Sequence, residues 1–167
     1  MILGMSLSTF TLFHVILSLI GIFAGAVVVG MLSSRPLDGW VTIFLATTVL
    51  TSVTGFFFPS DKILPSHIVG ILSLVALALA ILGLYVYHLA GSWRWIYVVG
   101  AVLALYLNVF VGVVQAFGKV AALHALAPTQ SDPPFIIAQA IVLVIFIALG
   151  FKAIRSFHPS APALRPG

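Results

Sequence analysis

The chain has 167 residues, of which 62% are hydrophobic and 6% are charged, whereas a soluble domain has about 45–50% apolar and about 25% charged residues. This composition excludes a water-soluble fold and predicts an integral membrane protein. The net charge of +4 is too small to indicate nucleic-acid binding, and the absence of cysteine excludes disulfides, thiolate metal sites and iron–sulfur clusters.

Five stretches of the chain approach the roughly 20 mainly apolar residues that a transmembrane helix needs. In chain order, the predicted spans are Phe10–Leu32, Trp40–Phe58, His67–His88, Trp95–Phe117 and Phe135–Ala153. No basic residue precedes the first stretch and no A-x-A-like cleavage site follows it, so we interpret it as a retained span. Residues 1–157 are therefore expected to form one all-α, five-transmembrane-helix bundle. The proline-rich residues 158–167 are expected to form a disordered tail.

The basic residues predict the orientation of the bundle, because cytoplasmic loops carry an excess of Lys and Arg. With five spans, Lys62 and Lys119 lie on the same side as the N-terminus. Five basic residues lie on the other side, namely Arg35, Arg94, Lys152, Arg155 and Arg165. Two against five predicts an N-out, C-in topology.

Small and polar residues recur at steps of three and four in the predicted spans, which places them on one face of each helix. These stripes consist of Thr11, His14, Ser18, Gly21 and Gly25; Thr48, Thr51, Ser52 and Gly55; Gly70, Ser73, Ala76, Ala80 and Gly83; Gly100, Ala104, Asn108, Gly112 and Gln115; and Gln139 and Gly150. Small residues let membrane helices approach closely, and polar ones hydrogen-bond between them. We expect the stripes to lie inside the bundle, mostly as packing positions, and Leu, Ile, Val and Phe to face lipid.

The larger polar residues gather near one face of the bilayer. They begin or end predicted spans on that side, or lie in the loop before the last span, and Asn108 lies about two turns deeper. The candidate ligand-binding residues are His14, Thr54, His67, Asn108, Gln115, His124, Asp132 and Gln139. We expect them to line a polar cavity that opens to the outer side.

Three kinds of ligand suit these residues. His14 and His67 form a candidate pair of axial ligands for a b-type haem. A quinone-like molecule needs hydrogen-bonding groups and an apolar slot, which His14, Asn108, Gln115 and Gln139 could provide together with nearby phenylalanines. A zinc or copper ion could draw on His67, His124, Asp61 and Asp132, but no H-x-x-H or H-x₃-H spacing occurs, so no metal site is assigned and the cofactor stays unknown.

In the alternative interpretation, these residues have a structural role in helix packing and helix capping. In that case His67 caps its helix, and Asp132 or Ser131 caps the last helix ahead of Pro133 and Pro134. The protein would then be a structural or assembly subunit that meets a membrane-protein partner or a second copy of itself.

A transporter or channel is less favoured, because no carboxylate lies inside any predicted span. An enzyme is also disfavoured, since the chain has no thiol, no G-x-S-x-G motif and no pair of carboxylates within the spans.

The segment "LYLNVFVGVVQAF", followed by "KV" and "ALAPTQSDPPF" and then Gln139, resembles uncharacterised small multi-span bacterial inner-membrane proteins. The resemblance extends to "SSRPLDGW" and "SWRWIYVV". It implies a bacterial inner (plasma) membrane location and no particular mechanism. It directs attention to Asn108, Gln115, His124, Gln130, Asp132 and Gln139, without assigning a role to any of them.

Overall fold

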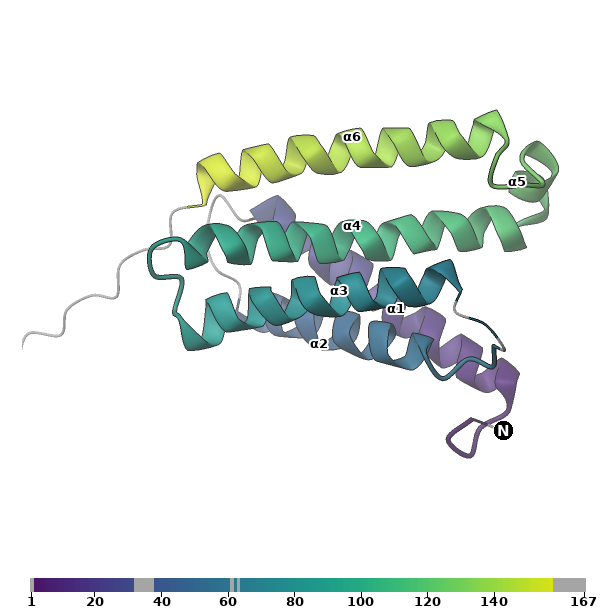
Figure 1. Cartoon of the computed structure of the whole chain (residues 1–167), viewed down its shortest axis with the longest axis horizontal. Coiled ribbons are helices and arrows are strands. Elements are labelled where there is room, and N and C mark those ends of the chain that lie inside the picture. Colours follow the sequence, from purple (N-terminus) through teal and green to yellow (C-terminus); the bar gives the residue numbers. More distant parts are fainter. Residues whose placement is uncertain (1, 32–37, 61, 63, 158–167) are drawn as a thin grey trace, which may run out of the picture.

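The computed structural model describes residues 2–31, 38–60, 62 and 64–157, and this part of the chain is helical with no strand. The elements are α1 (Leu7–Met31), α2 (Asp38–Gly55), α3 (Pro65–Ile81), the π-helix η1 (Leu82–Val86), α4 (Trp93–Lys119), α5 (Ala121–Leu126) and α6 (Pro133–Ser156). The long helices run alternately in opposite directions (Figure 1). The predicted disordered tail, 158–167, lies outside the described residues.

Four helices of the described chain are long and apolar enough to cross a membrane, which supports the prediction of a membrane protein. They are α1, α3 together with η1, α4 and α6. The second predicted span corresponds to α2, whose apolar helix Gly39–Gly55 is shorter than the others. At 1.5 Å per residue, the 18 residues of α2 extend about 27 Å, close to the roughly 30 Å of a bilayer's hydrocarbon core.

Prolines begin two of these helices and a strained turn ends another. Pro65 and Pro133 occupy the first turns of α3 and α6, where the missing N–H would have no partner in any case. The third helix ends at Val86 rather than at the predicted His88, because its last turn is the π-helix η1. The chain then reverses through two non-glycine residues with positive φ, His88 (47°) and Leu89 (60°).

The helices α1 to α4 form a four-helix core, and α6 packs mainly on α4 at its side (Figure 1). In the most apolar 18-residue stretch of α4, half of the residues are buried, whereas in the corresponding stretch of α6 only 6% are buried. α4 is therefore the central helix of the bundle, and α6 is peripheral.

Glycines on the predicted stripes allow close contacts between helices. A Cβ at Gly100 of α4 would lie 2.7 Å from the carbonyl oxygen of Ala76 in α3. A Cβ at Gly25 of α1 would lie 2.6 Å from Leu105 and 2.8 Å from Phe44. These contacts confirm that the small residues serve helix packing.

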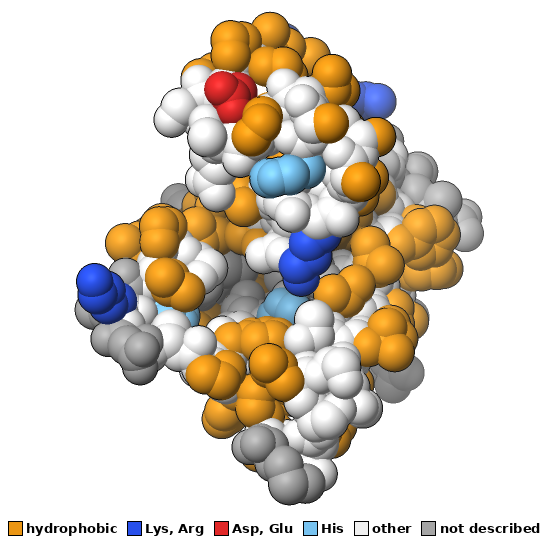
Figure 2. All heavy atoms as spheres, turned by 90° about the vertical axis from the view of Figure 1, so that its right-hand side faces the viewer, with side chains coloured by type: hydrophobic (Ala, Val, Ile, Leu, Met, Phe, Trp, Pro, Cys, Tyr) orange, Lys and Arg blue, Asp and Glu red, His pale blue; other side chains and the backbone are white. Residues whose placement is uncertain are grey.

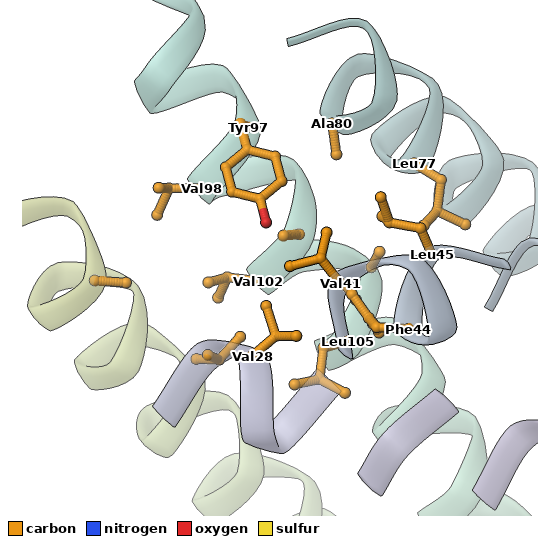
Figure 3. Close-up of a cluster of buried hydrophobic side chains, with 14 of the residues drawn as sticks. Val28, Val41, Phe44, Leu45, Leu77, Ala80, Tyr97, Val98, Val102 and Leu105 are labelled. Carbon is orange, nitrogen blue, oxygen red and sulfur yellow. The ribbon is translucent and has the colours of Figure 1, made fainter. Parts of the chain in front are cut away.

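The largest cluster of buried apolar side chains fills the half of the bundle away from α5. They come from the C-terminal half of α1, the N-terminal half of α2, the C-terminal half of α3 and the N-terminal half of α4, with Ala153 and Phe157 from the C-terminal end of α6 and just after it (Figure 3). The largest fully buried apolar side chains include Phe10, Phe44, Leu77 and Val98. The expectation that Leu, Val and Phe would all face lipid is therefore wrong for these residues, because the small stripes alone cannot fill the space between five helices.

Candidate functional site

The α5 end of the bundle contains α5, the N-termini of α1, α3 and α6, and the C-termini of α2 and α4 (Figure 1). Figure 2 looks onto this end, where Lys or Arg and His side chains lie around a hollow. The predicted candidate residues belong to this half of the molecule, although they do not form one cluster.

A hydrogen bond between α1 and α2 brings His14 and Thr54 together. The His14 ring lies against Phe58, and its Nδ1 is 2.8 Å from Thr54 Oγ1. The Thr54 hydroxyl donates to the carbonyl of Leu50 at 2.7 Å. With the hydroxyl donating to Leu50, Thr54 Oγ1 accepts from His14, and Nδ1 then carries the proton of the neutral ring. The lone pair of His14 Nε2 is left as an acceptor with no partner in the described chain.

Asn108 is buried deeper, between α1, α2 and α4. Ser18 Oγ donates to Asn108 Oδ1 at 2.8 Å, which ties α1 to α4. A Cβ on Gly21 would lie 3.0 Å from Thr48 Oγ1, 3.2 Å from Asn108 Nδ2 and 3.2 Å from Thr47 Oγ1. Polar groups of α2 and α4 thus converge on α1 at Gly21, which has no side chain.

Two buried hydroxyls beside these pairs, Thr48 Oγ1 and Thr51 Oγ1, have no hydrogen-bond partner among the described residues. Thr48, Thr51 and Thr54 are spaced three residues apart and so share one face of α2. We call His14, Ser18, Thr48, Thr51, Thr54 and Asn108 the polar track. Ser18 and Thr48 were predicted only as packing positions, although the threonine spacing was a signal that could have found Thr48.

His67 serves as a helix cap. The backbone N–H of Leu64 donates to His67 Nδ1 at 3.0 Å, and the ring stacks on Phe56 at 5.6 Å between centroids. Because Nδ1 accepts this hydrogen bond, the neutral ring carries its proton on Nε2. His67 therefore does not present an Nε2 lone pair beside that of His14, and the two rings do not fit a bis-histidine haem site as they stand.

Gln139 and Gln115 lie apart from the polar track. Gln139 Nε2 donates to the carbonyl of Phe110 at 3.1 Å, joining α6 to α4, while its buried Oε1 has no partner in the described part of the chain. Gln115 is exposed, which contradicts its predicted place inside the bundle. No described segment covers that face of the last turn of α4.

The segment between α4 and α6 is a structured cap rather than an open loop. His124 is exposed and lies in the short helix α5. Asp132 occupies the N-cap position of α6, but its carboxylate accepts from the backbone N–H (2.7 Å) and hydroxyl (2.9 Å) of Thr129 instead of from the helix. Asp132 thus fixes the turn that leads into α6. No group of three or more His, Cys, Asp or Glu that could hold a metal ion occurs in the described residues.

The first turns of α1 border an open groove of about 720 Å³. Its lining residues are Leu7, Ser8, Thr11, Leu12, Val15 and Lys119. Lys119, the last residue of α4, is also close enough to interact electrostatically with His14. The groove is thus mainly apolar with one cation at its edge; His14 lies on the same turns of α1 but is not one of its lining residues.

No family model matches this chain, and neither the curated proteins nor the solved structures contain a match to it.

Proposed function

We propose that this protein is a five-span protein of a bacterial inner membrane, with α2 as the fifth span and an N-out, C-in orientation. The proposal rests on the apolar character of α2, its length of 18 residues and the distribution of basic residues in the sequence.

We further propose that the protein binds a ligand with an apolar body and a hydroxyl group, such as a quinol, at the α5 end. The observation that carries this proposal is the His14 ring, which is held by Thr54 and retains an Nε2 acceptor. The groove along residues 7–15 offers an apolar surface for the rest of the ligand. Haem is less well supported, because the capping hydrogen bond to Nδ1 of His67 leaves the ring proton on Nε2, which then has no lone pair for iron.

The test is lipid-extract mass spectrometry and an absorption spectrum of protein purified in mild detergent from its native membrane. We expect a quinone- or quinol-like species to be enriched over bulk membrane lipid, and to be lost in His14→Ala. His124→Ala is the matched control, since His124 lies at the same end but is exposed on α5, and it should keep the ligand. A lipid profile equal to that of the membrane, with no melting-temperature shift across a quinone panel, would refute the proposal.

A structural or assembly role is the second candidate, and the exposure of α6 supports it. Only 6% of the residues in the apolar stretch of α6 are buried against the rest of the described chain. The large apolar side chains that it exposes are Ile136, Ile137, Ile141, Leu143, Val144, Ile145, Ile147 and Phe151. This role predicts a stoichiometric partner or a second copy cross-linked to α6 in the membrane, and a lone monomer at native expression would contradict it.

A further inference from the structure

The polar track contains unpaired groups that a dry membrane bundle would not be expected to keep. Thr48 is 1% exposed, and neither its hydroxyl nor that of Thr51 has a partner in the described chain. Buried polar groups in folded proteins are nearly always paired with protein atoms or with ordered water. In a bilayer the alternative is an unsatisfied group surrounded by hydrocarbon, which is costly.

The surroundings of Thr48 provide the several polar partners that a buried water needs. Thr47 Oγ1 and Asn108 Nδ2 converge with it on Gly21. Asn108 Nδ2 has two protons, and its one acceptor, the Ser18 carbonyl, is 3.5 Å away. The amide therefore retains donor capacity next to a hydroxyl that lacks a partner.

The track runs toward the α5 end, where Phe58 packs on the His14 ring and on the fully buried Phe10, and apolar side chains close it in the other direction. Thr51 lies between Thr48 and the His14–Thr54 pair, near the end whose hollow is visible in Figure 2. One turn beyond Gly21, the face of Gly25 meets Phe44 and Leu105, which are 0% and 2% exposed. The apolar core shown in Figure 3 continues from there.

We propose that the polar track is a hydrated cup: ordered water enters from the α5 end, passes the His14–Thr54 pair, and binds at Thr51 and at Thr48 with Asn108. The cup ends at Gly25 and Phe44, so it is not a pore. It places water at mid-depth in the bundle. The proposal does not depend on a ligand at His14, and its test uses water access alone.

The test uses single-cysteine variants, because the native chain has no cysteine to interfere. Thr51→Cys and Thr48→Cys are reconstituted in vesicles and exposed to a small cationic methanethiosulfonate reagent that does not cross lipid. Ala46→Cys is the matched control on α2, since Ala46 is exposed on the outside of the bundle near the same depth. Ala125→Cys on α5 identifies the side from which the α5 end is reached.

The reagent reacts with the thiolate, which forms only where water reaches the thiol. We therefore expect the reaction rate of Thr51→Cys to exceed that of Ala46→Cys roughly tenfold or more. Reaction should occur only from the side on which Ala125→Cys reacts, and Thr48→Cys should follow more slowly. If both track variants react no faster than Ala46→Cys, or react equally from both sides, the cup is refuted.

A stability measurement decides the question independently of the cysteine variants. Thr48→Val keeps the shape of the side chain and removes the hydroxyl. If the site is hydrated, removing a water ligand should lower the melting temperature in detergent. If the hydroxyl is unpaired and dry, the valine should raise it or leave it unchanged, and either result would overturn the proposal.

Discussion

Individual glycines determine how closely the helices of this bundle pack. At Gly100 the neighbour on the opposite helix is the backbone oxygen of Ala76, at 2.7 Å from the position of a Cβ. A flexible side-chain tip could move away from an added methyl group, but a helix backbone can do so only by shifting α3 as a whole. The contact between α3 and α4 therefore depends on the absence of a side chain at this residue.

We expect Gly100→Ala to lower the free energy of unfolding by about 1–3 kcal/mol, as overpacking typically does. The measurement is unfolding of the purified protein in mixed micelles at increasing denaturing detergent. Gly118→Ala is the control on the same helix, because a Cβ there meets nothing within 4 Å, and it should have no effect or stabilise slightly. Equal stability of the two variants would show that α3 and α4 do not pack as described.

The candidate residues show what sequence periodicity can and cannot locate. The stripe correctly placed Ser73, Asn108 and Gly100 inside the bundle, because a 3.6-residue period fixes which residues share a face. It misplaced Gln115, since the period does not tell where a neighbouring helix ends. Pairings such as Ser18 with Asn108, 90 residues apart, depend on how helices are arranged in space, and a single sequence does not contain that information.

At the scale of elements, the apolar runs predicted the five long helices, and their ends were less accurate. The short helix α5 was missed because its six residues form no apolar period long enough to recognise. The third helix was predicted two residues too long, because Val86, Tyr87 and His88 are compatible with a helix. The structure instead ends it with a π-turn and two residues of positive φ.

The turn after η1 offers a test of this ending. His88 is exposed and has a φ of 47°, a conformation that costs a non-glycine residue about 1–2 kcal/mol. We expect His88→Gly to raise the free energy of unfolding by about 0.5 kcal/mol, because the gain exceeds glycine's entropic cost of about 0.5–1 kcal/mol.

The same detergent titration measures this change. Ala90→Gly is the control in the same turn, where φ is not positive, and it should destabilise the protein. A loss of stability in His88→Gly as large as that in Ala90→Gly would contradict the left-handed turn.

At the scale of the whole molecule, the bundle is divided across its length. One half is closed by the apolar core, and the other carries the polar track and the groove at the α5 end. The side of the bundle with fewer basic residues in the sequence is this α5 end. With the proposed orientation, the polar half therefore opens to the outside of the cell.

This orientation and the crossing of α2 can be tested together, again because the chain has no cysteine. Gly39→Cys lies in the first turn of α2 and Ser60→Cys lies beyond its C-terminus, while Ala90→Cys and Ala125→Cys mark the two ends of the bundle. In intact cells we expect a membrane-impermeant maleimide to label the thiols at 60 and 125. The thiols at 39 and 90 should be labelled only after permeabilisation, because five spans alternate and the positive residues keep that side in the cytoplasm.

If 39 and 60 are labelled from the same side, α2 does not cross the membrane. If 60 and 125 are protected while 39 and 90 react in intact cells, α2 crosses but the orientation is the reverse, and the polar half faces the cytoplasm.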